Sequence, residues 1–284
     1  MPAICSIVSL SMLAESREGV RWAVGVEFDG REFRGWQTQQ PGVVTVQETL
    51  EAAISRVANH HVIVHGAGRT DAGVHGSGMI AHFDSTAVRS ERNWLMGINT
   101  LLPESVAVRW IQAISPDFHA RFKAVARRYH YFVYNHPRRS ALLAGRATWH
   151  YAPLDVERMQ AAANALIGVH DFSAYRAVAC QSKRPVRDVH FLKLSRRGEL
   201  IRLDIQADGF LHHMVRNIMG VLLAVGDGRA DIAWAGQVLA SADRTQAGVT
   251  APPDGLYFVD AHYPAEFDLP RSPLGPTWAA GWSE

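Results

Sequence analysis

One carboxylate lies in the middle of a glycine-rich stretch of the chain. Asp71 is the only acidic residue in the run 66–78, which contains five glycines and has Arg69 two positions before the acid. Glycine permits backbone conformations and close approaches to a ligand that other residues do not. The flanking segments 61–65 and 79–83 are rich in β-branched and apolar residues, which indicates a loop held between two strands. Because functional residues are often carried on loops that a scaffold holds in place, the pattern predicts a functional Asp71.

Two alternatives for this loop stay open at the level of sequence. Glycine-rich loops also cradle phosphate groups, and an aspartate in a tight turn often accepts a hydrogen bond from its own backbone. The phosphate interpretation is weak, because neither G-x-x-x-x-G-K-[ST] nor a G-x-G-x-x-G that opens a helix occurs in the chain. The loop by itself does not exclude the structural turn.

The other nucleophiles and metal-ligand residue types form no recognised catalytic motif. No H-E-x-x-H is present, and neighbouring histidines in a strand point to opposite faces. His212 and His213 fall on the polar side of a helix expected at 211–225, where contact with solvent or RNA is the ordinary role. Cys5 and Cys180 have no metal-ligand spacing. We therefore predict no metal site, and the carboxylate loop remains the strongest candidate for chemistry.

Composition indicates a protein that folds around an ample core. The chain has 284 residues, of which 48% are hydrophobic and 20% charged, and its formal net charge is +2. That length exceeds a typical single domain. Two cysteines suit a reduced compartment better than a disulfide scaffold, the N-terminus lacks the basic segment of a signal peptide, and no apolar stretch reaches membrane-spanning length. We expect a soluble, cytoplasmic protein that does not associate with a membrane.

Hydrophobic periodicity predicts a mixture of strands and helices. Apolar residues alternate cleanly over 200–208, which is typical of a strand, and Thr45 with Glu48 forms a capping box that opens a helix. The predicted strands are 21–28, 61–65, 79–83, 106–111, 127–134, 186–194, 200–208 and 255–260. The predicted helices are 45–57, 92–101, 155–167, 211–225 and 230–241.

This order of elements predicts an α+β fold. We expect two similar lobes that form a continuous, mainly antiparallel sheet, with helices on one face and an RNA-binding cleft on the other. The expected divisions are an N-terminal extension at 1–19, an N-terminal lobe with the catalytic Asp loop at 20–115, a C-terminal lobe with a basic and aromatic surface at 116–264, and a C-terminal tail at 265–284.

A long stretch of the second lobe carries positive charge without any acid. No aspartate or glutamate occurs between Asp117 and Asp155, and four aromatic residues interleave in the strand segment 129–134. The basic residues of this stretch are Arg121, Lys123, Arg127, Arg128, Arg138, Arg139 and Arg146. Such a mixture suits RNA, because arginines contact phosphates while each stacked base contributes about 1–3 kcal/mol. A solvated face above core tyrosines is the alternative, and the absence of acids favours nucleic acid.

Four sequence blocks occur in a familiar order between about residues 20 and 264. They are GRTDAGVHG at 68–76, ARRY at 126–129, FLHHMVRN at 210–217 and GLY at 255–257. Together they resemble the bacterial tRNA pseudouridine synthase A family. The resemblance implies an isomerase that needs no cofactor and converts uridine to pseudouridine at positions 38, 39 and 40, in the anticodon stem-loop of tRNA.

The resemblance also implies roles for individual residues. Asp71 corresponds to the nucleophile and Arg216 to the arginine that pairs with it. A nearby guanidinium favours the charged form of a carboxylate, which suits a nucleophile. Tyr129 corresponds to the ring that stacks on the flipped uracil, and Leu256 to the apolar residue on the other side of the base.

Binding of the tRNA is implied at further positions. Arg69 and Arg89 match positions tied to base flipping, where a guanidinium fills the space that the base leaves. Contacts to tRNA are implied for His119, Arg121, Phe122, Gln181, Ser182 and Lys183. Family members are homodimers that hold one tRNA across both subunits, so the resemblance implies a homodimer with an eight-stranded sheet in each subunit.

Two other classes of function remain as alternatives at this point. One is a non-catalytic protein that binds or remodels RNA with the same fold. The other is a glycosidase or phosphate-processing enzyme built on the glycine-rich loop. A single carboxylate suits isomerisation, whereas hydrolysis by two carboxylates would deliver water to C1′ and release the base.

Overall fold

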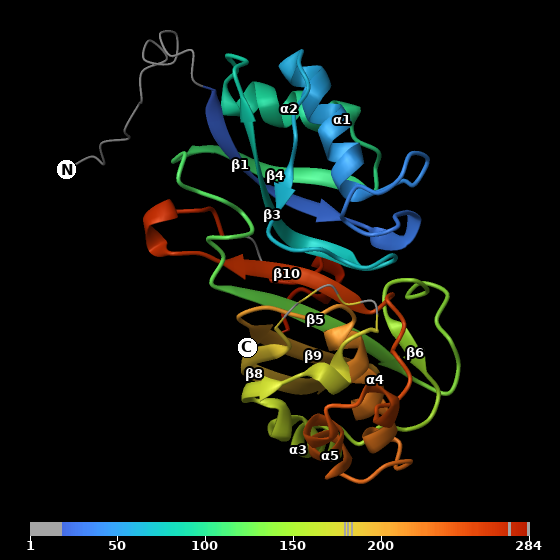
Figure 1. The fold of residues 1–284 in the computed structure, drawn as a ribbon. Coiled ribbons are helices and arrows are strands. Elements are labelled where there is room, and N and C mark those ends of the chain that lie inside the picture. The colour runs from blue at the N-terminus through green and yellow to red at the C-terminus, as the bar shows by residue number, and fades with distance from the viewer. Residues whose placement is uncertain (1–18, 179, 181, 183, 272–273, 283–284) are drawn as a thin grey trace, which may run out of the picture.

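The computed structural model describes residues 19–178, 180, 182, 184–271 and 274–282 (Figure 1). Residues 1–18 of the expected N-terminal extension lie outside this part of the chain. The strands are β1 Val20–Phe28, β2 His65–Gly66, β3 His75–Ser85, β4 Val106–Ile114, β5 Ala126–Asn135, β6 Thr148–His150, β7 Gly168–Asp171, β8 Val186–Arg197, β9 Leu200–Ala207 and β10 Leu256–His262. The α-helices are α1 Val46–Ala58, α2 Glu91–Leu101, α3 Val156–Ala163, α4 Met214–Gly226 and α5 Trp234–Ser241.

The strands form one sheet that runs through the described structure. Its order is β4-β1-β3-β10-β5-β9-β8-β7, and the two short strands β2 and β6 pair with β3 and β5. The pairings β10–β3 and β5–β6 are parallel, and the remaining ladders of the described residues are antiparallel. The predicted α+β class with a continuous, mainly antiparallel sheet is confirmed. Eight strands form the main path, the number that the resemblance implies. This path includes β7, which was not among the predicted strands, whereas β2, at the end of the predicted strand 61–65, lies beside it with β6.

The last strand joins the two halves of the sheet. In β10, Tyr257 and Phe258 pair with His75 and Gly76 of β3, while the other edge of β10 pairs with β5 (Figure 1). Helix α2 packs against β4 and α1, whereas α3 packs against β8 and α4. The last strand therefore lies at the centre of the sheet, directly beside β3, the strand that follows the Asp71 loop.

Local sequence signals account for the starts of α1 and α3. The Oγ1 of Thr45 accepts a hydrogen bond from the Glu48 amide and caps α1, as the capping box predicts. The Oδ1 of Asp155 accepts from the amide of Arg158 and caps α3 in the same way. No helix in the described part of the chain has both the length and the apolar character needed to cross a lipid bilayer.

The strand predicted before the loop is shorter than expected. The sequence predicted 61–65, but β2 has only two residues. The amide of Val62 donates to the Ser55 hydroxyl, and that of Val64 donates to Glu51 Oε1. Side chains of α1 thus satisfy backbone groups that a longer strand would use, and the segment packs on the helix instead.

Residues near the C-terminus cover the sheet face on which Phe132 of β5 and Ser195 of β8 lie. The expectation of a tail at 265–284 treated these residues as lying outside the folded lobes, but the segment 274–282 packs on β5 and β8. The ring of Trp278 lies 4.8 Å from that of Phe132, and Nε1 of Trp282 donates to the Ser195 hydroxyl at 2.7 Å. The middle parts of β5 and β9 are therefore buried on both sides of the sheet.

Candidate active site

The loop that carries Asp71 is fixed against the segment after β1. The amide of Trp36 donates to the carbonyl of Thr70 at 3.2 Å, and the amide of Val74 donates to the carbonyl of Asp71 at 3.2 Å. Gly35 has a φ of +97°, and a Cβ there would lie 2.4 Å from the Thr70 carbonyl oxygen. Only glycine allows both this conformation and this close approach. The backbone of Asp71 is therefore held on both sides.

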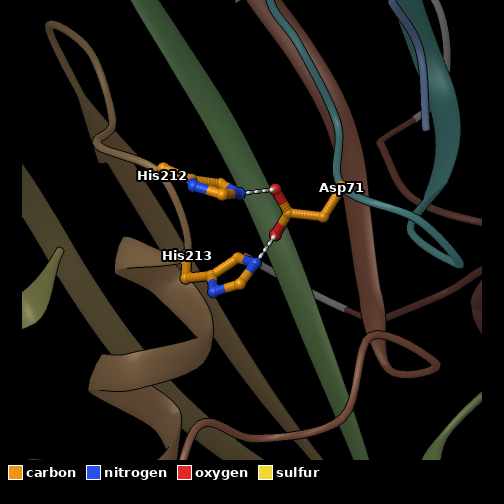
Figure 2. Close-up of side chains that lie close together, drawn as sticks. All are labelled: Asp71, His212 and His213. Carbon is orange, nitrogen blue, oxygen red and sulfur yellow. Dashed lines mark ion pairs between the residues drawn. The ribbon is translucent and has the colours of Figure 1, made fainter. Parts of the chain in front are cut away.

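The carboxylate of Asp71 points toward three side chains at the start of α4. Its Oδ2 accepts a hydrogen bond from Nη1 of Arg216 at 3.2 Å. Nε2 of His212 lies 3.4 Å from Oδ1, and Nε2 of His213 lies 3.5 Å from Oδ2 (Figure 2). The Asp71 side chain is 20% exposed, so solvent or a ligand can reach it. The arrangement differs from a structural turn, because the carboxylate interacts with another element.

Arg216 is itself oriented by backbone. Its Nε donates to the carbonyl of Ala251 at 2.8 Å, and the amide of Ala251 donates to the Arg216 carbonyl at 3.1 Å. The Arg216 side chain is 13% exposed. A guanidinium fixed in this way loses little rotamer freedom when it binds the carboxylate. The sequence resemblance implied this pairing, and the structure brings the two side chains together.

The two histidines lie on a turn rather than on a helix. The predicted helix at 211–225 begins three residues late, at Met214, and His213 precedes it with a φ of 62°. This left-handed residue turns both imidazoles toward the Asp71 loop. Burial lowers the pKa of His213, while the Asp71 carboxylate opposes that shift. The expected helix face is therefore corrected to a turn, from which both histidines contact Asp71 while their rings stay partly exposed in the pocket.

Asn217 also departs from the expected polar face of that helix. It is fully buried, its Nδ2 donates to the carbonyl of Tyr175 at 2.8 Å, and its Oδ1 accepts from Thr250 at 2.6 Å. The polar residue thus holds α4 to the surrounding segments. Amphipathic spacing alone did not show this, because both sides of the helix are covered.

Asp71 is one of the residues that line a pocket of about 1060 Å³. Tyr129 and Leu256 also line this pocket and are only 7% and 5% exposed. The centre of the Tyr129 ring lies 4.9 Å from that of Phe210 and 5.1 Å from that of Phe258. Burial raises the pKa of the Tyr129 hydroxyl well above its ordinary range, and the negative charge of Asp71 adds to this. Sequence-predicted site residues that line the pocket are Asp71, Arg69, Arg121, Tyr129, Ser182, Arg216 and Leu256.

The pocket opens on the sheet face that carries helices, which corrects the expected position of the cleft. Tyr129 and Tyr131 belong to the same core as the buried residues of α4. Side chains alternate along a strand, so Phe132 points to the opposite face, where Trp278 covers it. The first turn of α4 supplies one wall of the pocket. The cleft around Asp71 therefore does not lie on the face opposite the helices.

Comparison with known proteins agrees with these observations. A sequence model described as tRNA pseudouridine synthase matches residues 25–123 and 162–264. The chain belongs to this family. The tRNA pseudouridine synthase A of Acinetobacter baumannii strain AYE is 56% identical over 258 residues, which cover 91% of this chain and 97% of that protein. The protein of the same name from Alcanivorax borkumensis is 55% identical with the same coverage.

A distant structural likeness also exists. The crystal structure of a Cbf5-Nop10-Gar1 complex aligns over 84% of this chain and 48% of its own, with a TM-score of 0.36 and 12% sequence identity. The sequence matches, rather than this likeness, establish the family of this synthase.

Several predicted contact residues of the synthase lie outside the pocket. Arg89 is exposed on the segment before α2, where Nη1 donates to the Val88 carbonyl, and it does not line the pocket. His119 and Phe122 stack on each other at 4.3 Å beside the pocket residue Arg121. Phe122 is 74% exposed. Two further predicted residues, Gln181 and Lys183, lie outside the described part of the chain.

Sequence reasoning missed other residues of the synthase's pocket. Arg127 donates to the carbonyls of Ala67 and Arg121, so it ties the Asp71 loop to β5. The position of Arg127 close to Tyr129, in a stretch without acidic residues, was the sequence signal that could have assigned it to the site. Residues of the pocket that the sequence did not assign to the site are Arg34, Gln37, Arg127, Arg187, Asp208, Phe210, His212 and His213.

One group in the synthase's pocket has the residue types of a metal site. Asp71, His212 and His213 each offer a ligand atom, and these atoms all lie within 4.8 Å of one another. The other acidic residue of the pocket, Asp208, accepts a hydrogen bond from the Asp188 amide at 3.1 Å. The described pocket therefore holds two carboxylates, and Arg216 is bound to only one of them.

Proposed function

We propose that this enzyme converts uridine to pseudouridine at positions 38, 39 and 40 in the anticodon stem-loop of tRNA, with Asp71 as the nucleophile. One observation carries the proposal: a guanidinium holds the Asp71 carboxylate in an accessible pocket of about 1060 Å³. The specific positions rest on the sequence resemblance, and the relatives named tRNA pseudouridine synthase A support tRNA as the substrate.

The reaction requires no atoms beyond those of the substrate. The C1′–N1 bond breaks, the uracil turns, a C5–C1′ bond forms, and a proton leaves C5 while N1 gains one. Asp71 can support this by attack on C1′, by attack on the base, or by assisting a route through a deprotonated sugar. Each route needs one ionised carboxylate beside the sugar. Hydrolysis by two carboxylates would place water at C1′ and lose the base.

The pocket walls suit a uracil that has left its stack. Eversion of a base costs a few kcal/mol, which contacts in the pocket must offset. Tyr129 offers the face of a buried ring, and Leu256 offers an apolar side chain. Because burial raises the pKa of Tyr129, its hydroxyl stays protonated at neutral pH. Arg69 lines the same pocket and can occupy the space that the base leaves in the stem-loop.

The charge of the pocket suits the tRNA backbone. Its cationic side chains are Arg34, Arg69, Arg121, Arg127, Arg187 and Arg216. Arginine contacts to phosphate release counterions, so binding should weaken steeply as salt is added. We further propose that the enzyme acts in the cytoplasm as a homodimer, with one tRNA held across both subunits. Light scattering of the purified protein that gives the mass of one chain would contradict the dimer.

A matched pair of carboxylate variants tests the role of Asp71. Release of tritium from C5 of labelled uridine in anticodon stem-loop RNA reports the isomerisation. Asp71→Asn is expected to lower the rate by more than about 1000-fold, because the nucleophile is lost. Affinity for the RNA should change little, since the amide keeps the shape of the side chain.

Asp208→Asn serves as the control in the same pocket. Asp208 is exposed and bonds a backbone amide, so its loss should leave the isomerisation rate within about threefold. If Asp71→Asn keeps the wild-type rate, or if Asp208→Asn alone abolishes it, the assignment of the nucleophile is wrong.

A further inference from the structure

The contact of two imidazoles with the Asp71 carboxylate has a geometry that isomerisation of uridine does not require. Nε2 of His212 lies 3.4 Å from Oδ1, and Nε2 of His213 lies 3.5 Å from Oδ2. We propose that these three side chains form a binding site for one Zn²⁺ ion, and that zinc bound there inhibits the enzyme. The inhibition rests on the proposed role of Asp71, whereas the binding does not.

The three side chains lie close enough together to approach one zinc ion. Zinc binds nitrogen and oxygen ligands at about 2.0–2.2 Å in tetrahedral geometry, which places neighbouring ligand atoms about 3.4 Å apart. Nε2 of His212 and Nε2 of His213 approach different oxygens of the Asp71 carboxylate, at 3.4 and 3.5 Å (Figure 2). Ligand atoms taken one from each residue all lie within 4.8 Å of one another, so side-chain rotation would bring three of them around one ion. The two imidazole ring centres lie 4.0 Å apart, so both rings can reach the same ion.

The ligand types select the class of metal. Two imidazole nitrogens and one carboxylate suit Zn²⁺ and its neighbours among the transition metals, whereas Mg²⁺ and Ca²⁺ prefer sites made of oxygen atoms. Water could supply a fourth ligand, because Asp71 and both histidines line an accessible pocket. The ligands also come from two fixed segments, the Asp71 loop and the turn before α4. Binding would therefore need rotation of the side chains but no movement of these two segments.

Arg216 opposes a cation at this site. Its Nη1 lies 3.2 Å from Oδ2 of Asp71, so zinc and the guanidinium compete for the same negative charge. Removal of the guanidinium should therefore tighten zinc binding while it slows isomerisation. Opposite effects of one substitution on binding of the metal and on catalysis are specific to a shared carboxylate.

A second group of histidines is a weaker candidate for zinc. The rings of His65, His82 and His119 lie close together, with ring centres 4.6–5.5 Å apart. His82 is 2% exposed, and its Nδ1 accepts a hydrogen bond from the Ala120 amide at 3.1 Å. No carboxylate completes a compact group with them among the described residues. His65→Gln is therefore a suitable control.

Zinc titration of the purified full-length protein against a chromophoric chelator tests the site without any RNA. The wild type is expected to bind one zinc per chain. His212→Gln and His213→Gln should each weaken binding by about tenfold or more, because loss of even the hydrogen-bond partners of metal ligands costs 10–100-fold. Arg216→Gln should bind zinc more tightly than the wild type, whereas His65→Gln should bind it with the affinity of the wild type. Thermal melts confirm that each variant is folded.

The inhibition is tested with the same proteins in the tritium-release assay. Zinc should inhibit the wild type over the concentration range in which it binds, and a chelator should restore the rate. Unchanged zinc affinity in the His212→Gln/His213→Gln double variant would overturn the site. Stoichiometric binding without inhibition would overturn only the inhibitory role. An Asp71→Asn enzyme that remains active yet binds zinc weakly would refute the proposed nucleophile and leave the metal site standing.

Discussion

Two aspartates in this synthase are each surrounded by arginine and histidine, on opposite faces of the same sheet. Asp204 of β9 is bound by both nitrogens of a bidentate Arg128, at 2.8 and 2.7 Å, with His130 at 3.4 Å. Asp71 has one bond of 3.2 Å to Arg216 and two histidine contacts that are no shorter than 3.4 Å. The residue types are the same, and the contacts differ in length and number.

Accessibility separates the two groups further. The Asp204 side chain is 4% exposed, and Trp282 covers the neighbouring Arg202 with its ring. The two hydrogen bonds from Arg128, together with the nearby His130 ring, outweigh burial and hold the pKa of Asp204 well below its usual range. The Asp71 side chain is 20% exposed and faces a pocket. A carboxylate that is sealed and fully bonded stabilises the fold, whereas one that is held by a single cation and open on one side can react.

The largest expected effect is the loss of stability when the sealed carboxylate is neutralised. Asp204→Asn removes the carboxylate from its buried ion pair with Arg128, and breaking such a pair costs about 3–5 kcal/mol. Urea unfolding at pH 7 measures this cost. Asp71→Asn, measured in parallel, should change the free energy of unfolding by about 1 kcal/mol or less. Equal costs for the two variants would remove the distinction between the two groups.

The same variant gives a pH test whose sign follows from the lowered pKa of Asp204. Its stabilising effect is present above the ordinary carboxyl pKa, about 4 in an unfolded chain, and is lost as the pH falls toward the folded-state value. The difference in unfolding free energy between wild type and Asp204→Asn should therefore be constant from pH 7 to pH 5 and shrink below about pH 4. A gap that widens on acidification contradicts this account.

A smaller effect is expected when the cation of the open group is removed. Arg216→Gln should lower kcat/KM by about 10–100-fold, because a hydrogen bond to a charged group contributes about 1.5–3 kcal/mol. Steady-state kinetics on anticodon stem-loop RNA measures it. Arg34→Gln removes another cation from the same pocket and is the matched control. If both variants lose the same activity, Arg216 acts through general charge and not through Asp71.

The smallest expected effect is on tRNA binding, when an exposed arginine of the pocket is replaced. Arg121 lines the pocket with an exposed side chain, in contrast to the buried Arg202 behind the sheet. Arg121→Gln should weaken tRNA binding and reduce the slope of log affinity against log salt by about one, which corresponds to the loss of one phosphate contact. Filter binding at several salt concentrations measures the slope. A slope equal to that of the wild type would exclude Arg121 from contact with phosphate.

Much of this architecture could be predicted because its signals are local. The Thr45 cap, the alternation of β9 and the strand that leaves the Asp71 loop depend on residues close in sequence, and the structure confirms them. The four sequence blocks led to the family that the comparisons establish. The pairing of Asp71 with Arg216, which lie 145 positions apart, entered only through the resemblance.

The features that sequence reasoning missed depend on contacts between distant segments. The start of α4 shifted because His213 adopts a left-handed conformation with no side-chain cap to announce it. Residues 62–64 packed on α1 because Glu51 and Ser55 supply partners for their amides. The C-terminal tryptophans covered β5 although the segment resembles a tail rich in proline. Spacing along the chain carries no information about such partners.

The most direct test of the contrast between a reactive and a structural carboxylate is a map of pseudouridine in total tRNA from cells that lack this protein. The cells are restored with the wild type, with Asp71→Asn or with Asp208→Asn, at equal protein levels. The account predicts that the wild type and Asp208→Asn return pseudouridine to positions 38, 39 and 40, while Asp71→Asn leaves uridine there. Pseudouridine at those positions in the Asp71→Asn cells would contradict it.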